Sequence, residues 1–241
     1  MEKIRISKYL SEQGLMSRRT ADEEISAGRV SVNGKTATLG QKIDPVSDVV
    51  SYKGKPVGGE VKKVCIMLNK PRGYVTTMED ERGRKCVADL VSDVGVRVYP
   101  IGRLDRDSEG LLLLTNDGEL ANMLTHPKYH KPKVYNVKVR GTVDEKTLER
   151  LRRPFNIDGY ITKSAEVKRL GETDGITSLS IRLFEGRNRQ IRKMCEKCSL
   201  TVMRLTRIAI GSLKLGSLEK GKWRELTSAE IDYLYGKSAN D

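Results

Sequence analysis

The most informative stretch of this chain is Gly102-Arg103-Leu104-Asp105-Arg106-Asp107-Ser108-Glu109-Gly110-Leu111-Leu112-Leu113-Leu114-Thr115. The apolar run at its end, from Leu111 to Leu114, predicts a buried strand. The charged residues and glycines before that run predict a turn. A solvated turn before a buried strand explains Asp107, Ser108 and Glu109, but it leaves Arg103 and Asp105 without a role.

The same turn also has part of the pattern of a calcium-binding loop. Asp105, Asp107, Glu109 and Gly110 stand at positions one, three, five and six of such a loop. Position twelve is Asn116 rather than a bidentate glutamate, and the flanking residues predict a strand where the calcium motif needs helices. The calcium interpretation therefore fails at its last ligand.

The segment from residue 61 to residue 241 alternates strand-like and helix-like runs around this stretch. The predicted strands are 64–68, 111–115, 134–139, 176–184, 208–210 and 213–215, and the predicted helices are 118–125, 144–153, 189–198 and 228–234. Many strands among fewer helices indicate an α+β domain with a mostly antiparallel sheet.

The first 60 residues predict a separate, smaller domain of two helices and a hairpin. Apolar residues from Ile4 to Leu15 have helical spacing, and Ser17 is a candidate N-cap for a second helix over 18–27. Residues 30–38 alternate as two strands around Asn33-Gly34, a favoured hairpin turn. The Gly, Pro and Lys content of residues 52–59 predicts a linker before the larger domain.

The charge of the chain indicates a polyanionic partner. Lys and Arg exceed Asp and Glu by 13, with 35 basic against 24 acidic residues in 61–241 (+11) and a net charge of +2 in 1–60. Nucleic acid is the expected partner rather than membrane lipid, because no basic amphipathic helix with a bulky aromatic face is visible. A basic surface that serves only solubility is the alternative. Four sparse cysteines and a charged start, without a membrane span, predict reduced thiols and a cytoplasmic location.

Two further segments could carry chemistry. One is Lys133-Val134-Tyr135, which opens a predicted strand; a tyrosine there is usually a packed core edge. The other runs from Phe184 to Met194, within 182–207, where eight basic residues stand against two acidic ones. A glycine turn that leads into an arginine-rich helix start can clamp a phosphate or a carboxylate.

These segments occur in a recognisable order. The chain resembles the RsuA/RluB family of ribosomal pseudouridine synthases over nearly its whole length. The resemblance rests on Leu68-Asn69-Lys70-Pro71-Arg72-Gly73-Tyr74, Tyr99-Pro100-Ile101-Gly102-Arg103-Leu104-Asp105, Leu111 to Gly118, Lys133-x-Tyr135 and Glu185-Gly186-Arg187-Asn188-Arg189-Gln190-Ile191-Arg192. The helix-hairpin start, with Ser17-Arg18-Arg19 and Gly28 to Gly34, resembles the S4-type RNA-binding domain; a helix-hairpin domain with ordinary surface arginines is the alternative.

The resemblance implies a role for each matched position. Asp105 would be the catalytic aspartate, Tyr135 would stack on the target base, and Arg192 would pair with the Asp105 carboxylate. The remaining expected RNA contacts are Arg18, Arg19, Arg29, Arg103, Arg187, Arg189 and Gln190. The isomerisation of uridine to pseudouridine needs neither cofactor nor metal. The aspartate could attack the sugar or the base, or could remove a sugar proton, and the sequence does not choose among these routes.

The resemblance also suggests the substrate. Small-subunit enzymes of the family tend to have an aromatic residue and a His-Gln pair where this chain has Asn188-Arg189-Gln190, which favours a 23S over a 16S ribosomal RNA target, free or in a subunit precursor. We expect a monomer. The rival functions are a non-catalytic ribosome-binding or assembly factor and a metal-dependent nuclease using Asp105, Asp107 and Glu109.

Two minor features complete the sequence analysis. Cys195 and Cys198 with His126 and His130 could be imagined as a zinc site, but the cysteine spacing falls within a predicted helix and a second ligand pair is missing. Trp223 is either a stacking platform for RNA or, as is commoner, a packing anchor.

Overall fold

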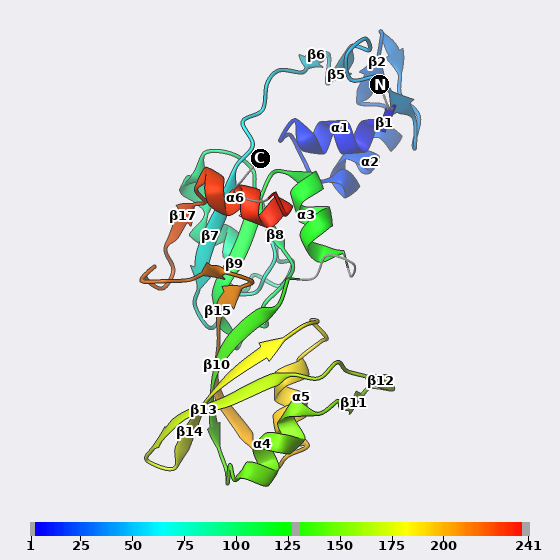
Figure 1. Cartoon of the computed structure of the whole chain (residues 1–241). Coiled ribbons are helices and arrows are strands. Elements are labelled where there is room, and N and C mark those ends of the chain that lie inside the picture. Colours follow the sequence, from blue (N-terminus) through cyan, green and yellow to red (C-terminus); the bar gives the residue numbers. More distant parts are fainter. Residues whose placement is uncertain (1–2, 127–130, 238–241) are drawn as a thin grey trace. The chain divides into compact units, whose positions relative to one another are not determined.

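The computed structural model describes residues 3–126 and 131–237. The chain separates into two compact units, which we describe one at a time (Figure 1). The smaller unit holds residues 1–64, 94–98 and 116–118, and the larger unit holds the rest.

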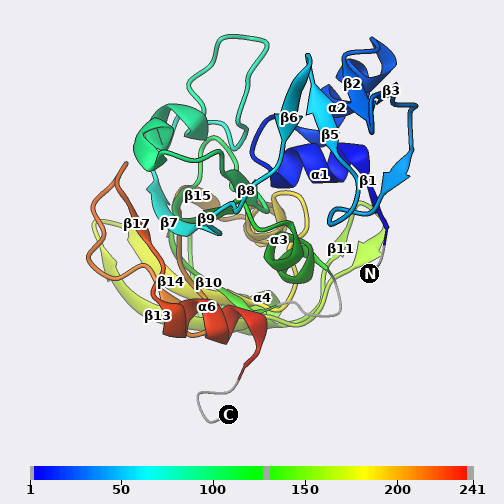
Figure 2. The ribbon, with the colours of Figure 1, turned by 90° about the horizontal axis from the view of Figure 1, so that it is seen from above.

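The smaller unit consists of two helices packed against a small sheet (Figures 1 and 2). Its elements are β1 (Ile4–Arg5), α1 (Ile6–Glu12), α2 (Arg18–Ser26), β2 (Val30–Val32), β3 (Lys35–Thr36), β4 (Lys42–Ile43), β5 (Val50–Tyr52) and β6 (Lys55–Val57). The main sheet has the order β3-β2-β5-β6, and β1 pairs with β4. Ser17 caps α2 by accepting a hydrogen bond from the Thr20 amide at 3.0 Å, and Asn33 and Gly34 both have positive φ, as the predicted hairpin turn requires.

The linker predicted for residues 52–59 begins too early. Lys53 and Gly54 adopt positive φ (49° and 77°) and form a second tight turn, so that β6 returns along β5. The residues predicted to be a linker therefore include a strand, because the Gly and Pro content of a hairpin turn resembles that of a linker.

The larger unit is organised by one nine-stranded sheet. Its central order is β13-β14-β10-β15-β9-β7-β17, with β8 beside β9 and β16 beside β15. The strands are β7 (Cys65–Lys70), β8 (Tyr99–Ile101), β9 (Glu109–Thr115), β10 (Lys133–Arg140), β13 (Glu166–Thr173), β14 (Ile176–Leu183), β15 (Thr201–Ile210), β16 (Leu213–Lys214) and β17 (Trp223–Glu225). The pairs are antiparallel, apart from the parallel contact between β9 and β15, which confirms the α+β class with a mostly antiparallel sheet.

Two apolar cores lie along this sheet. One is formed by β10, β13, β14 and β15 with α4 (Glu145–Arg152) and α5 (Gln190–Glu196), and the other by β7 and β9 with α3 (Gly118–Thr125) and α6 (Ser228–Tyr235) (Figure 1). Short 3₁₀ helices cover Val87–Leu90 and Ser92–Val94, and β11 (Asn156–Ile157) and β12 (Tyr160–Ile161) form a hairpin.

The parallel contact between β9 and β15 requires a glycine. Gly110 lies opposite Arg207 in this pair and has φ +103°, and a Cβ at Gly110 would lie 2.2 Å from the main-chain oxygen of Arg207. The two strands therefore approach each other closely where the turn of residues 102–108 enters β9.

Candidate active site

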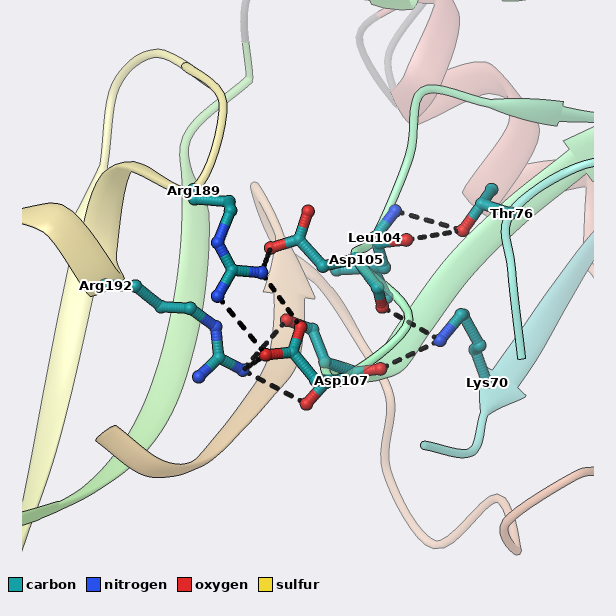
Figure 3. A network of polar contacts seen from close by, with 8 residues as sticks. Lys70, Thr76, Leu104, Asp105, Asp107, Arg189 and Arg192 are labelled. Atoms are coloured by element: carbon teal, nitrogen blue, oxygen red, sulfur yellow. Dashed lines mark hydrogen bonds and ion pairs between the residues drawn. The ribbon is translucent and has the colours of Figure 1, made fainter. Parts of the chain in front are cut away.

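Asp105 lies in the turn between β8 and β9, and main-chain contacts hold this turn in place. Lys70, the last residue of β7, donates from Nζ to the main-chain oxygens of Pro71 (3.1 Å), Asp105 (3.1 Å) and Ser108 (2.9 Å), as Figure 3 shows for the last two. The Thr76 hydroxyl donates to the Leu104 oxygen (2.7 Å) and accepts from the Leu104 amide (3.2 Å). The path of the main chain on both sides of Asp105 is thus fixed by hydrogen bonds.

Lys70 is fully buried, which is unusual for a lysine. Burial lowers its pKa to about 8, although the nearby charges of Asp105, Asp107 and Glu109 oppose that shift. Lys70 belongs to the Leu68–Tyr74 family motif, and the sequence alone gives it no role. Its hydrogen bonds show that Lys70 supports the turn that carries Asp105.

Two arginines from the start of α5 reach this turn (Figure 3). Arg189 Nη1 lies 3.6 Å from Asp105 Oδ2 and 3.2 Å from Asp107 Oδ1. Arg192 Nη2 lies 3.1 Å from Asp107 Oδ2 and donates to the Asp107 main-chain oxygen at 3.1 Å. The expected pairing of Arg192 with Asp105 is therefore replaced: Arg189 is the arginine that contacts Asp105, and Arg192 contacts Asp107.

The conformation of the α5 N-terminus explains this exchange. Arg189 is the N-cap residue of α5 and has a left-handed backbone conformation (φ 51°, ψ 31°), and its side chain extends to both aspartates. Arg192 starts nearly one turn further along the helix and is more buried, with 14% of its side chain exposed against 43% for Arg189. Burial would raise the pKa of Asp107, but the hydrogen bonds of Arg189 and the charges of both arginines lower it, so Asp107 is a structural anion.

Asp105 lies where two hollows of the larger unit meet. A cavity of about 410 Å³ includes Arg103, Asp105, Tyr135, Arg187 and Arg189 in its lining. A wider groove of about 1010 Å³ on the other side also includes Arg103, Asp105 and Arg189, together with the segments 72–84 and 103–107. The Asp105 side chain keeps 28% of its surface exposed, so it is accessible from solvent.

The cavity has the composition of a site for a planar base. Tyr135 and Lys133 face it from β10, and its apolar lining includes Leu183, Leu205 and Ile210. One cavity therefore brings together six of the residues predicted from the sequence: Arg103, Asp105, Tyr135, Arg187, Arg189 and Gln190. Arg192 contacts Asp107 and does not line the cavity.

The turn that carries Arg187 is built around the buried carboxylate of Glu185. Glu185 accepts hydrogen bonds from the Lys163 amide (2.9 Å), the Tyr160 hydroxyl (3.2 Å) and the Gln190 side chain (3.1 Å). The guanidinium of Arg187 stacks on the Tyr160 ring at 3.4 Å from the ring centre. The β11–β12 hairpin thus supports the arginine turn, a contact between segments that the sequence analysis did not connect.

Gln190, an expected RNA contact, is buried in this turn. It is 3% exposed. Its side-chain nitrogen donates a hydrogen bond to Glu185, and its side-chain oxygen accepts one from the Arg187 amide at 3.1 Å. The amide oxygen and the amide nitrogen each have a partner inside the turn, so Gln190 supports the turn at the edge of the cavity, and its contact with RNA stays a prediction.

The RNA contacts predicted in the smaller unit lie at its surface. Arg18 and Arg19 are exposed in the first turn of α2, where main-chain N–H groups also point outward. Arg29 is exposed as well, but it forms a two-point ion pair with Glu24 (2.5 and 2.7 Å). Arg18 and Arg19 are therefore better placed than Arg29 to meet phosphate.

The acidic and sulfur side chains that suggested metal sites have other partners. Glu109 pairs with Arg204 and with Lys220 (3.1 Å), while Asp105 and Asp107 face the α5 arginines. Burial raises the pKa of Cys195 to about 12 and also raises that of Cys198, so both thiols are held protonated. His130 lies outside the described residues. Trp223 donates to Asp93 at 2.7 Å and pairs opposite Leu68 in the sheet, which favours its interpretation as a packing anchor.

The fold and the site are those expected of an RNA-modifying enzyme, with Asp105 and Tyr135 at one cavity and a separate helix-hairpin unit. Residues 64–197 match the RNA pseudouridylate synthase family, and residues 4–50 match the S4 domain. The chain belongs to the RNA pseudouridylate synthase family and is an isomerase that forms pseudouridine.

Relatives match over almost the full length. The chain is 44% identical to an uncharacterized RNA pseudouridine synthase of Aquifex aeolicus, over 98% of this chain and 95% of that protein. It is 41% identical to ribosomal large subunit pseudouridine synthase B of Bacillus subtilis, over 98% and 99%. A solved crystal structure of a pseudouridylate synthase superimposes with a TM-score of 0.67 at 28% identity, covering 96% of this chain and 99% of that one.

The matches confirm the predicted family, the enzyme class and the order of a helix-hairpin domain before an α+β domain. They favour the enzyme over the non-catalytic ribosome-binding factor. Among the described residues, none of the helices is both long and apolar enough to cross a membrane.

Proposed function

We propose that this enzyme isomerises a specific uridine of ribosomal RNA, and that its target lies in the large-subunit (23S) RNA or a precursor of that subunit. The observation that carries the proposal is the cavity shared by Asp105 and Tyr135, with cationic side chains at its edge. Only a base that is flipped out of the folded RNA can enter such a cavity, and flipping the base costs a few kcal/mol. Stacking on Tyr135 would recover about 1–3 kcal/mol of that.

In this proposal Asp105 is the group that reacts with the flipped nucleotide. Its carboxylate attacks the sugar or the base, or removes a sugar proton, while Arg189 at 3.6 Å keeps it oriented. Arg192 acts through Asp107 and the main chain of the turn, which makes it a positioning residue. Arg103 and Arg187 are the proposed phosphate contacts beside the cavity.

The large-subunit target is supported by two observations. The chain has Asn188-Arg189-Gln190 where small-subunit enzymes tend to have an aromatic residue and a His-Gln pair. The Bacillus subtilis relative, which is matched along its whole length, is named for the large ribosomal subunit.

We also propose that residues 1–60 form an RNA-binding domain and residues 61–241 the catalytic domain, joined between the end of β6 at Val57 and the start of β7 at Cys65. Arg18 and Arg19 would supply phosphate contacts, and removal of this domain would weaken RNA binding without changing the chemical step. The protein would act in the cytoplasm as a monomer.

The test is to map pseudouridine in ribosomal RNA from cells with and without this gene, and to repeat the mapping after incubating the unmodified RNA with purified enzyme. Loss of one 23S site in the mutant cells, restored in vitro by the wild type but not by Asp105→Asn, is the expected result. A site in 16S RNA would overturn the large-subunit assignment, and unchanged ribosomal RNA would overturn the ribosomal target.

A further inference from the structure

The mechanism above leaves one buried cation at the cavity without a function. Arg207 lies on β15, is 3% exposed and belongs to the cavity lining. Its Nε donates to the main-chain oxygen of Leu111 at 2.7 Å, whereas its Nη2 is buried and has no hydrogen-bond partner among the residues that the structure describes. A guanidinium has five N–H donors, and the two on Nη2 lack an acceptor.

The position of Arg207 relates it to the aromatic residue of the site. Arg207 lies opposite Tyr135 in the pairing of β10 and β15, so both side chains belong to the same face of the sheet. Lys133, two residues before Tyr135, shares that face and also lines the cavity. Burial and the charge of Arg207 lower the pKa of Lys133 to about 8. The stacking position thus has one buried cationic group, Arg207, and one partly buried cationic group, Lys133, beside it.

An unsatisfied charged donor in such a place calls for an acceptor. Burial of a charged group with incomplete hydrogen bonding is strongly unfavourable, and such a group in a native structure needs an explanation. The cavity lining also contains the apolar side chains of Leu113, Leu205 and Ile210. A ligand that enters the cavity is therefore the natural source of the acceptor.

The chemistry of the surroundings favours a base oxygen over a phosphate as that acceptor. Phosphates are strongly hydrated and remain at the surface, where the exposed Arg103, Arg187 and Arg189 can reach them. A base that stacks on Tyr135 presents ring carbonyl oxygens at its edge, next to the strand that carries Arg207.

We propose that Arg207 is a catalytic residue that binds a ring carbonyl oxygen of the flipped uracil and stabilises the negative charge that develops on the ring. When the bond between C1′ and N1 breaks, its electron pair stays on the uracil and is shared by N1 and the two carbonyl oxygens. The ring then bonds to C1′ through C5, the proton on C5 leaves, and N1 takes up a proton. A donor fixed at a carbonyl oxygen stabilises the state in which the ring is detached.

The test compares Arg207→Met and Arg207→Lys with Thr206→Val as the matched control. Thr206 is the adjacent residue of β15, and its hydroxyl bonds Glu109 rather than a group of the cavity (2.9 Å). Tritium release from 23S transcript labelled with [5-³H]uridine is measured in single-turnover reactions at saturating enzyme, and RNA affinity is measured as a function of salt. The choice of RNA rests on the proposed ribosomal target, and total cellular RNA serves as a second substrate.

Arg207→Met should lower the single-turnover rate about 10²–10³-fold, as loss of one such donor does elsewhere, with RNA affinity and its salt slope unchanged. Arg207→Lys should recover part of the rate, because it keeps the charge but loses the two-donor fork. Thr206→Val should react at the wild-type rate.

Wild-type rates in both Arg207 variants would overturn the proposal. So would weaker binding with a salt slope lower by about one unit, because that result identifies a phosphate contact. If Arg207→Met does not fold, the rate of Arg207→Lys decides alone. Wild-type activity on total RNA but not on 23S transcript would contradict the ribosomal target and leave the comparison of variants intact.

Discussion

Replacement of Lys70 by methionine tests how the turn that carries Asp105 is held. Methionine fills a similar volume but cannot donate to the main-chain oxygens of Pro71, Asp105 and Ser108. We expect Lys70→Met to destabilise the larger unit and to lower the catalytic rate, because the main chain on both sides of Asp105 loses its support.

The magnitude follows from two opposing contributions. Three hydrogen bonds from a charged donor contribute about 5–9 kcal/mol, at about 1.5–3 kcal/mol each. Burial lowers the pKa of Lys70 from 10.5 to about 8, and at about 1.36 kcal/mol per pH unit the charged lysine therefore costs about 3 kcal/mol, which methionine avoids. The net loss at neutral pH is about 2–6 kcal/mol.

The effect has a defined pH dependence. Between pH 8 and 10.5 the unfolded chain binds a proton at Lys70 that the folded chain has released. The free energy of unfolding of the wild type therefore rises with pH in this window, relative to Lys70→Met, by up to about 3 kcal/mol, and the difference is constant below pH 8.

The chain contains one tryptophan, so its fluorescence can follow the larger unit alone. Trp223 lies on β17 and pairs with Leu68 of β7, the strand that ends at Lys70. Urea unfolding is compared at pH 7.5 and 9.5 for the wild type, Lys70→Met and Lys168→Met, an exposed lysine on β13. Equal midpoints for the two variants, or a wild-type advantage that does not grow with pH, would refute the reasoning.

Three further changes have expected outcomes. Asp105→Asn should bind RNA with wild-type affinity and form no pseudouridine, and product above the uncatalysed background would exclude Asp105 as the reacting group. Gly110→Ala forces a Cβ to within 2.2 Å of the Arg207 oxygen, so the unfolding free energy measured with the tryptophan signal should fall by about 2–4 kcal/mol; an unchanged midpoint contradicts the close approach. Tyr160→Leu should raise the KM for RNA about 2–5-fold through loss of the Arg187 stack, whereas Tyr160→Phe should not, and equal KM values would show that the stack has no role.

The sequence predicted those parts of the fold that have a local signal. Helix α3 was found at the predicted residues, and α4 follows a capping Asp144 whose side chain accepts from the Thr147 amide at 2.8 Å. In the larger unit the missed strands are β8, β11, β12, β13, β17 and most of β15, of which only residues 208–210 were predicted. In β13 only Val167 is buried, so the strand has little alternation and is defined by its pairing with β14, which no local pattern contains.

The site was predicted as a set of residues but not as a set of contacts. The turn at Asp105, the strand at Tyr135 and the arginine-rich segment were each recognised, and the cavity brings Asp105, Tyr135, Arg187 and Arg189 together. Which arginine meets which aspartate depends on the left-handed conformation of Arg189, and a repeated pattern of arginines does not reveal it. The burial of Lys70 and Arg207 could not be predicted from the sequence either, because it depends on contacts between strands that are distant in sequence.

The hydrogen bonds of Lys70 also bear on how the enzyme could be retargeted. Because Lys70 binds main-chain oxygens, its support of the turn does not depend on the side chain at an exposed position such as Arg103. Exposed positions such as Arg103 can then be randomised to fit a different RNA sequence while Asp105 stays in place. The turn thereby separates substrate choice from chemistry, which makes its outer face a suitable starting point for the design of synthases with new target sites.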